Sequence, residues 1–367
     1  MLIRFEVENF KNFKDKLVFC LDKTKGYEFN DYLIKDGILR GGVIFGKNAS
    51  GKSNLGLALF DLINNLTDKE KTTRFATPFK NLDSVVKDVK FKYVFKFDNK
   101  ILEYSYSKIA PTEFIKEELK IDGKSLIKYD YEKQEGYCKL KGTELLINNI
   151  KGNSLSYVKY VKNNSVLEEN DDNKVFNMFI NYVEHMLLFY SLDYNRYFGY
   201  TVGSESIAEG IIKKGKLKEF EKFLNDLEIN YKLDEKELDG KKQIYVKFDE
   251  GEANFYSVAS TGTRALALFF YWSISSEEVS LIFMDEFDAY YHYELSYFIV
   301  KYILKNKNAQ ILFTSHNTNL MNNDLFRPDC LFIMQNKGIK SMSDLTEKEL
   351  RQAHNLQKMY KAGAFDE

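Results

Sequence analysis

Residues 46–53 constrain this chain more than any other segment, because they read GKNASGKS and match the pattern G-x-x-x-x-G-K-[ST] in full. A short apolar stretch, 43–45, precedes them, and an apolar-periodic stretch follows, which is the strand–loop–helix context in which this pattern binds phosphate. The glycines let the backbone approach a phosphate closely, and successive N–H groups at the helix start then face the anion. The sequence therefore predicts a nucleotide-binding loop. A plain glycine-rich turn before a helix is the alternative, and the flanking pattern disfavours it.

The residues of this loop have separate expected roles. Lys52 supplies a positive charge for the β- and γ-phosphates, and the Ser53 hydroxyl can bind Mg²⁺. The expected nucleotide-binding set is Gly46, Lys47, Asn48, Ala49, Ser50, Gly51, Lys52, Ser53 and Asn54. One face of the following helix is expected to bury Leu55, Leu59, Leu62, Ile63 and Leu66.

A second apolar stretch, 281–284, ends in the carboxylates Asp285 and Glu286. Such a strand would bring Asp285 to Mg²⁺ beside Ser53, and Glu286 could polarise an attacking water. An apolar strand ending in two acids is weak evidence alone. Together with the phosphate loop it predicts an enzyme that binds and hydrolyses ATP with Mg²⁺.

A third apolar stretch, 310–314, is followed by Ser315 and His316. The C-terminal end of a strand lies at the ligand edge of an open α/β sheet, so His316 is expected to hydrogen-bond the γ-phosphate and the attacking water. An isolated histidine would more simply be packed or solvent-facing, but the order of the motifs favours a functional role here. The other three are interpreted as structural, namely His185, His292 and His354.

Residues 260–264, STGTR, form a small-residue turn directly before the apolar stretch ALALFFYW. A turn that opens a helix can bind an anion, and Ser260 and Gly262 are the expected contacts. Because this turn would compete with residues 46–53 for the same phosphates, it is more economical that it serves the nucleotide of a second subunit, with Arg264 approaching the γ-phosphate in trans. An ordinary Ser/Thr helix cap explains the turn equally well.

Alternating patterns predict a second β-rich region. In residues 89–97 apolar side chains alternate with Lys90, Lys92 and Lys96, which is typical of a half-buried strand. Residues 86–140 are therefore predicted to form an antiparallel β-subdomain. The lysine row is interpreted as a solvated face more readily than as a nucleic-acid site. Further on, residues 217–227 predict an amphipathic helix, and Thr346 with Glu349 predicts the cap of a last helix.

The length of 367 residues suggests two or three domain-sized units. The patterns along the chain predict three parts, at 1–172, 173–270 and 271–367. The first and last would form the ATPase lobe, and the middle part an α-rich lobe that carries STGTR. A net charge of −1 gives no bulk basic field, although a local basic patch is compatible with it. Three scattered cysteines and the lack of a membrane-length apolar run predict a cytoplasmic protein with no membrane partner.

The segments GKNASGKS, STGTR, LIFMDEFD and TSHN occur in the order and spacing of ABC-type ATPase heads, the branch that includes SMC proteins, RecF and the OLD family. The chain resembles most the stand-alone bacterial AAA-family ATP-binding proteins of the RloA and AriA kind, including its opening LIRFEVENFKNF and its closing YKAGAF. The resemblance covers nearly the whole chain. It implies an α/β fold, an ABC-type P-loop NTPase head with a mixed central sheet, an antiparallel β-subdomain and an α-helical lobe. It also implies a head-to-tail, ATP-sandwiched homodimer, or a higher oligomer, that acts in antiviral (phage) defence or DNA surveillance.

The chain departs from these relatives in several respects. STGTR differs from the usual Ser-Gly-Gly-Gln-like signature, no glutamine can be assigned to a Q-loop, and neither a Toprim nuclease nor coiled-coil arms are expected. Toxic or nuclease action is therefore expected from a separate effector protein. Two alternatives stay open. One is a RecF-like ATPase that binds duplex DNA, and the other is an ATP-dependent scaffold or antitoxin-like protein with negligible turnover.

Overall fold

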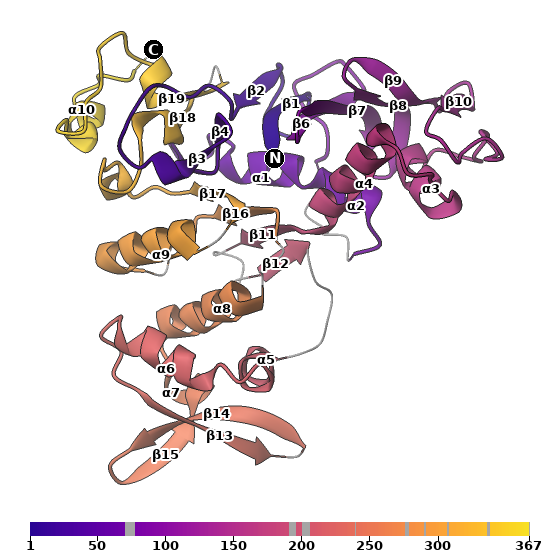
Figure 1. Cartoon of the computed structure of the whole chain (residues 1–367). Helices are drawn as coiled ribbons and strands as arrows, with labels where there is room; N and C mark the ends of the chain where they lie inside the picture. The colour runs from indigo at the N-terminus through magenta and orange to yellow at the C-terminus, as the bar shows by residue number, and fades with distance from the viewer. Residues whose placement is uncertain are drawn as a thin grey trace.

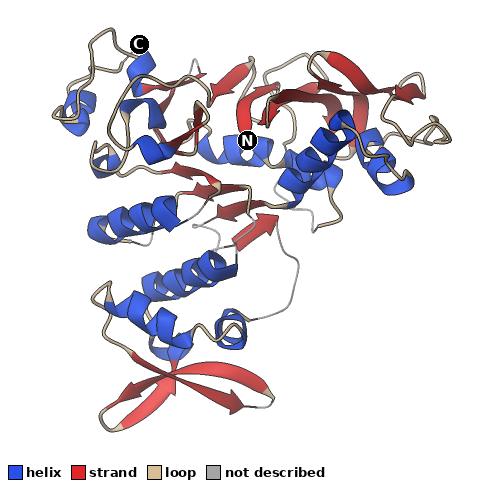
Figure 2. Cartoon of the chain, in the orientation of Figure 1, coloured by secondary structure: helices blue, strands red, loops and turns tan. Residues whose placement is uncertain are grey.

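The computed structural model describes residues 1–69, 78–190, 196–199, 206–238, 240–275, 279–289, 291–306, 308–335 and 338–366. Two seven-stranded sheets and the helices on them form the larger lobe, drawn in the upper part of Figure 1. A smaller lobe of helices with a three-stranded sheet at its far end extends below it (Figure 2).

The central sheet carries the phosphate-loop strand in its interior. Its order is β12 (Arg196–Gly199), β11 (Met186–Tyr190), β16 (Leu281–Asp285), β17 (Gln310–Thr314), β5 (Gly41–Gly46), β18 (Leu331–Gln335) and β19 (Gly338–Ser341). The five inner strands are parallel, and the two edge strands are antiparallel to their neighbours. The inner strands are continuous apolar runs, as expected for a sheet covered on both faces. The predicted mixed sheet is confirmed, and β17 lies between β5 and β16.

Helices cover the central sheet on two sides (Figure 1). On one side lie α1 (Lys52–Leu59) and α2 (Asp61–Leu66), and on the other lie α8 (Thr261–Ser275) and α9 (Tyr293–Asn306). The sequence predicted one helix as far as Leu66, but α1 ends at Leu59, and the next residue, Phe60, has φ −92° and ψ 5°. The second helix then begins at Asp61, whose carboxylate is held by Lys108 of the β-subdomain. The predicted apolar face is buried despite this break.

The second large sheet is antiparallel throughout. Its order is β10 (Glu135–Cys138), β9 (Lys124–Asp130), β8 (Glu113–Ile121), β7 (Lys100–Ala110), β6 (Val89–Phe97), β1 (Leu2–Glu8) and β2 (Leu17–Cys20). It confirms the predicted β-subdomain and extends it by the two N-terminal strands. On its outer face Lys90 pairs with Glu8 at 3.1 Å and Lys92 with Glu103 at 2.5 Å. These ion pairs favour a solvated face over a nucleic-acid site.

A buried glutamine joins the two sheets. The side-chain Nε2 of Gln310, at the start of β17, donates to the carbonyl oxygens of Leu2 (2.9 Å) and Leu39 (2.8 Å). Its Oε1 accepts from the Leu2 N–H at 3.1 Å and from the Tyr182 hydroxyl at 2.9 Å. All four hydrogen-bonding positions of the amide are thus used. This residue fixes β1 against the central sheet.

The segment from residue 171 to 190 belongs to the larger lobe, although the helical lobe was expected to begin at 173. In α4 (Asp171–Glu184), Phe179 packs against Phe95 of β6 at a ring-centroid distance of 5.3 Å, and Tyr182 packs against the same ring at 5.2 Å. The next element, β11, pairs with β16 in the central sheet. The boundary is misplaced because an amphipathic helix does not reveal which sheet will cover its apolar face. A short helix, α3 (Tyr157–Asn164), precedes it.

The smaller lobe contains more β-structure than the prediction implied. Its helices are α5 (Ile207–Lys213), α6 (Leu217–Asn225), α7 (Phe255–Val258) and α8, and its sheet is β13 (Lys232–Leu238), β14 (Lys241–Phe248) and β15 (Gly251–Asn254). The predicted amphipathic helix is α6, which buries Phe220, Phe223 and Leu224. The remaining short elements are the hairpin β3 (Ile34–Lys35) and β4 (Ile38–Leu39), and 3-10 turns at Asp31–Leu33, Thr318–Leu320, Pro328–Cys330 and Met342–Asp344.

The predicted helix cap at Thr346 is wrong. The Thr346 hydroxyl accepts from the Lys348 N–H at 3.2 Å within a turn, and the last helix, α10 (Leu356–Lys361), is capped by Asn355 instead. The residues after Glu349 lack the apolar periodicity that a capping box needs behind it. In the described part of the chain, none of the helices has the length and apolar character needed to span a membrane.

Candidate nucleotide-binding site

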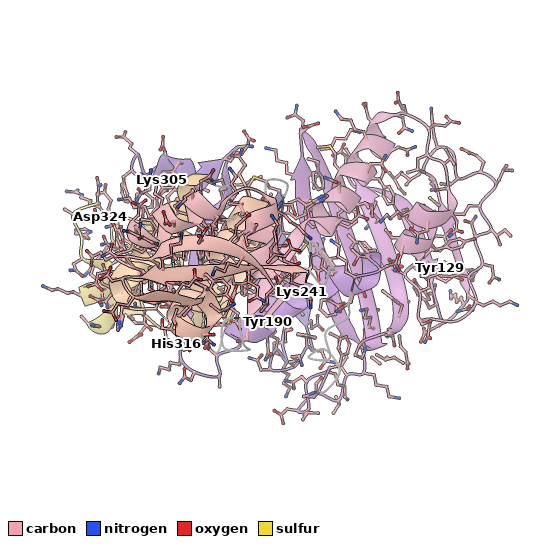
Figure 3. All side chains as sticks on the ribbon, turned by 90° about the horizontal axis from the view of Figure 1, so that it is seen from below. Tyr129, Tyr190, Lys241, Lys305, His316 and Asp324 are labelled. Carbon is pink, nitrogen blue, oxygen red and sulfur yellow. The ribbon has the colours of Figure 1, made fainter. Side chains whose placement is uncertain are left out.

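Three predicted motifs meet at one edge of the central sheet. The strands β5, β17 and β16 are adjacent and parallel, so the residues that follow them emerge at the same edge. In Figure 3, His316 after β17 and Tyr190 at the end of β11 lie at this edge, whereas Lys305 near the end of α9 lies at the opposite one. The strand order therefore places His316 between the phosphate loop and the acidic pair.

The phosphate loop has two residues in the left-handed region of backbone conformation. Ala49 has φ 62° and Gly51 φ 105°, both in the left-handed region, which lets successive N–H groups point toward one concave side. A Cβ atom on Gly51 would overlap the Asn12 side chain and lie 2.8 Å from Cε1 of Phe13. A Cβ atom on Gly46 would lie 2.7 Å from Ser50 Oγ and 2.8 Å from the carbonyl oxygen of Met334. Space thus requires both glycines of the motif, and the left-handed backbone favours glycine at position 51 as well.

Lys52 points back over the loop and reaches His316. Its Nζ atom donates to the carbonyl oxygens of Gly46 (3.1 Å) and Lys47 (3.3 Å) and lies 2.9 Å from His316 Nε2. Burial lowers the pKa of Lys52, and the nearby carboxylates of Glu286 and Asp285 oppose this shift. A lysine ammonium has donors only, so Nε2 of His316 is the acceptor in this contact.

The acidic pair is held by a threonine that the sequence did not single out. Asp285 ends β16, and its Oδ1 accepts a hydrogen bond from the Thr314 hydroxyl at 2.8 Å. The same hydroxyl oxygen accepts the Glu286 N–H at 2.7 Å. Glu286 has φ 46°, a left-handed conformation that costs a non-glycine residue about 1 kcal/mol and is found most often at functional sites. Its Oε1 lies 3.5 Å from His316 Nε2.

Close packing brings the start of α1 to the end of β16. A Cβ atom on Gly56 would lie 2.7 Å from Cε1 of Phe283, so glycine lets this helix lie directly on the strand. Ser53, in the first turn of α1, and Asp285, at the end of β16, therefore face the same edge. Hydroxyl and carboxylate oxygens are ligands that Mg²⁺ accepts together with substrate phosphates.

This donor set suits a metal bound with nucleotide better than a closed protein cage. The described residues contain no group of three or more His, Cys, Asp or Glu side chains that could hold a metal ion. Ser50 Oγ is buried in the loop without a hydrogen-bond partner, which leaves a polar atom for a ligand to satisfy.

Asn12 is a second residue that sequence reasoning missed. Its Nδ2 donates to the carbonyl oxygen of Ser50 at 3.2 Å, and its Oδ1 accepts from Asn54 Nδ2 at 2.7 Å. The turn after β1, where Phe10 bridges to Phe13, thus clasps the phosphate loop from outside. Asn54, predicted to contact nucleotide, directs its amide to Asn12. The opening LIRFEVENFKNF is part of the family resemblance, but the pattern predicts no role for Asn12.

The turn at 260–264 is not joined to this site within one chain. Ser260 Oγ accepts the Thr263 N–H at 3.1 Å, so Ser260 does cap α8. Arg264 is exposed, and its Nε donates to the carbonyl oxygen of Ala259 at 3.0 Å. No hydrogen bond or ion pair between described residues connects 260–264 with 46–54. The contacts predicted for Ser260, Gly262 and Arg264 across a dimer stay a prediction.

Comparison with curated proteins gives no match. Among solved structures, the chain is similar to the SMC head domain from Thermotoga maritima, with 15% identity, a TM-score of 0.43 and coverage of 92% of this chain and 97% of that one. It is also similar to an SMC head bound to the C-terminal winged-helix domain of ScpA, with 12% identity, a TM-score of 0.45 and coverage of 93% and 97%.

A family model described as "AAA domain, putative AbiEii toxin, Type IV TA system" matches residues 43–322, from the phosphate-loop strand to beyond His316. This match and the strand order confirm the predicted ABC-type ATPase head. The chain belongs to this family of AAA-domain proteins.

Proposed function

We propose that the chain binds ATP with Mg²⁺ and hydrolyses it. The observation that carries this proposal is the convergence of three side chains from three separate segments. Lys52 lies 2.9 Å from His316 Nε2, and the same ring nitrogen lies 3.5 Å from Glu286 Oε1. A cation for phosphate, a carboxylate base and a polar group between them are the parts that phosphoryl transfer to water requires.

Each group has a definite task in this proposal. The N–H groups of the loop and the start of α1 bind the phosphates, and Lys52 neutralises charge on the β- and γ-oxygens. Glu286 accepts a hydrogen bond from the attacking water and orients it. His316 lies where it can bond both the γ-phosphate and that water. Mg²⁺, held by Ser53 and Asp285 with phosphate oxygens, would stabilise the charge that develops on the leaving phosphate.

A head-to-tail homodimer would complete the site. Ser260 and Gly262 lie in the turn that opens α8, a 15-residue helix, and Arg264 is exposed there. A helix start and an arginine are suited to the γ-phosphate held by a partner subunit. Among the described residues, no hydrogen bond or ion pair joins this turn to the chain's own phosphate loop, and this supports a role in trans.

The biological role we propose is that of a sensor or trigger in antiviral defence, with a separate effector protein and a cytoplasmic setting. The toxin–antitoxin description of the family supports this role. A scaffold that uses ATP only as a structural ligand would have no need for Glu286 and His316 beside Lys52. Loss of phage protection in cells carrying Lys52→Ala at the native locus would support the defence role, and unchanged protection would contradict it.

Hydrolysis is tested with Glu286→Gln. This variant should still bind ATP and Mg²⁺, while steady-state phosphate release falls by about two to four orders of magnitude, the usual contribution of a general base. Size-exclusion chromatography with ATP and Mg²⁺ should then show a trapped dimer. Glu250→Gln, in the exposed turn between β14 and β15, is the matched control and should behave as wild type.

Lys52→Ala identifies the binding loop. Calorimetric titration with a non-hydrolysable ATP analogue should show that binding is lost, because the phosphates lose their main counter-charge. Wild-type affinity in this variant would mean that residues 46–53 are not the nucleotide site. A Glu286→Gln protein that binds ATP yet stays monomeric would contradict the sandwich dimer.

A further inference from the structure

The end of β17 holds the acidic segment after β16 through consecutive side chains. Thr314 bonds both Asp285 and the backbone of Glu286, with distances of 2.8 and 2.7 Å. The next residue repeats the pattern, because Ser315 Oγ donates to Asp288 Oδ2 at 2.6 Å while accepting the Asn317 N–H at 2.8 Å. Thr314 and Ser315 are both fully buried, so water does not compete for these bonds.

The direction of each Thr314 bond is fixed by chemistry. The Glu286 N–H can only donate, so the hydroxyl oxygen accepts it, and the single hydroxyl hydrogen is left for Asp285 Oδ1. The threonine thus sets the rotation of the Asp285 carboxylate and holds Glu286 in its left-handed conformation at the same time.

We propose that Thr314 is a positioning residue that makes Asp285 ready for Mg²⁺ and directs the Glu286 side chain toward His316. This inference deepens the proposed function and rests on it. Groups that hold a metal ligand in one orientation are worth about 10- to 100-fold in metal affinity or activity. A small rotation at Thr314 would disturb the Asp285 carboxylate and the Glu286 backbone together, because one hydroxyl bonds both.

The test uses Thr314→Val, which keeps the shape and removes the hydroxyl, and Thr314→Ser, which keeps the hydroxyl. Mg²⁺ is titrated calorimetrically into each protein saturated with a non-hydrolysable ATP analogue. Thr314→Val should lower the apparent Mg²⁺ affinity by about 10- to 100-fold and lower kcat, with analogue affinity in EDTA unchanged. Thr314→Ser should restore both values.

Thr143→Val is the matched control. Its buried hydroxyl donates to the carbonyl oxygen of Leu140 at 2.6 Å, in the segment that follows β10 and outside the site. It should lower the melting temperature as Thr314→Val does, without changing Mg²⁺ affinity or kcat. In an Asp285→Asn background, Thr314→Val should cause no further loss of Mg²⁺ affinity. Thr314→Cys, a weak donor, replaces the valine variant if that protein does not fold.

Wild-type Mg²⁺ affinity in Thr314→Val or Thr314→Cys would overturn the inference. So would equal losses in Thr314→Val and Thr314→Ser, because the hydroxyl would then be irrelevant. These outcomes leave ATP binding by the wild-type chain intact. A wild-type chain that binds no nucleotide would overturn the proposed function and this inference with it.

Discussion

The Nε2 atom of His316 lies 2.9 Å from Nζ of Lys52, although 264 positions separate the two residues in the chain. Lys52 comes from the first turn of α1, and His316 follows β17, the strand beside β5. The contact exists because these adjacent parallel strands deliver their following residues to one edge. It makes His316 the residue through which the phosphate loop and Glu286 are connected.

His316→Ala is expected to slow hydrolysis more than it weakens binding. Lys52 keeps the carbonyl oxygens of Gly46 and Lys47 as partners, so analogue affinity should change little. The γ-phosphate and the water lose a polar contact, and kcat should fall by about 100-fold, the size seen for one lost transition-state donor. Steady-state phosphate release and calorimetry measure the two effects. His354→Ala, whose Nδ1 accepts the Arg351 N–H in a surface turn, is the control and should keep wild-type kcat. Wild-type turnover in His316→Ala would remove this residue from the site.

The motifs of the site were predictable because each is short and directly follows a predicted strand. The phosphate loop, Asp285 with Glu286, and His316 each follow an apolar stretch that can be read locally. The supporting residues were not predictable. Thr314 bonds Asp285, and Asn12 bonds Ser50, in each case across tens of residues. An isolated Thr or Asn in a sequence belongs to no pattern from which a distant hydrogen-bond partner can be predicted.

The fold shows the same division. Alternation predicted the antiparallel sheet, since a period of two is set by the strand itself. The break at Phe60 and the packing of α4 on the β-subdomain depend on tertiary partners, namely Lys108 for Asp61 and Phe95 for Phe179. Gln310, which ties β17 to Leu2, was read only as the first residue of a strand.

Asn12→Ala should weaken nucleotide binding, although Asn12 is not itself one of the residues expected to contact the nucleotide. Two hydrogen bonds to the loop are lost, each worth about 0.5–1.5 kcal/mol, so the loop becomes less ordered before ligand binds. Calorimetry with the ATP analogue should show an affinity reduced by about tenfold, which corresponds to about 1.4 kcal/mol. Asn99→Ala, in the exposed turn between β6 and β7, should bind as wild type. Equal affinities in the two variants would show that Asn12 does not organise the loop.

The buried ion pair of Lys108 and Asp61, which links the β-subdomain to α2, should make a large contribution to the free energy of unfolding. Lys108 Nζ donates to Asp61 Oδ2 at 2.8 Å, and both side chains are almost completely buried. Lys108→Met leaves a buried carboxylate without this cation and should cost about 3–5 kcal/mol of unfolding free energy.

The matched surface change for this test is Lys90→Met, which removes a half-exposed partner of Glu8. It should cost no more than about 1 kcal/mol. Urea denaturation of both variants gives the comparison, and the double variant Asp61→Asn with Lys108→Met should recover part of the loss. Similar costs for the two single variants would show that the buried pair has no special weight.

Asp288 predicts a pH dependence of stability. Burial raises the pKa of its carboxyl, and the hydrogen bond from Ser315 opposes this shift. A raised folded-state pKa means that the contribution of Asp288 is fully present below the unfolded pKa of about 3.9 and is lost as pH rises through the folded value. Asp288→Asn does not titrate, so it should gain stability relative to wild type between about pH 4 and pH 7. Urea denaturation across this range measures the difference. Ser315→Ala, which removes the opposing hydrogen bond, should move the transition to higher pH, and a pH-independent difference in both variants would contradict the assignment.

Arg264 provides the test of the dimer. If Arg264 serves the nucleotide of a partner subunit, Arg264→Ala and Lys52→Ala should each be nearly inactive alone. Mixed together, they form heterodimers with one site that lacks both groups and one site that has both. That intact site should recover part of the ATPase rate. If both groups serve the same nucleotide in one chain, every site in the mixture is broken and no rate returns.

The measurement is steady-state phosphate release from equimolar mixtures, after native mass spectrometry has confirmed that heterodimers form. Arg351→Ala, which removes an exposed arginine that pairs with Glu349 in a surface turn, replaces Arg264→Ala in the control mixture. The rate in that mixture should follow the content of intact Lys52. Confirmed heterodimers without recovery would count against action in trans, unless both sites must fire together. Titration of wild type with each variant separates the absence of action in trans from a requirement that both sites fire together. If the sites are coupled, the ATPase rate falls by more than the fraction of variant subunits added.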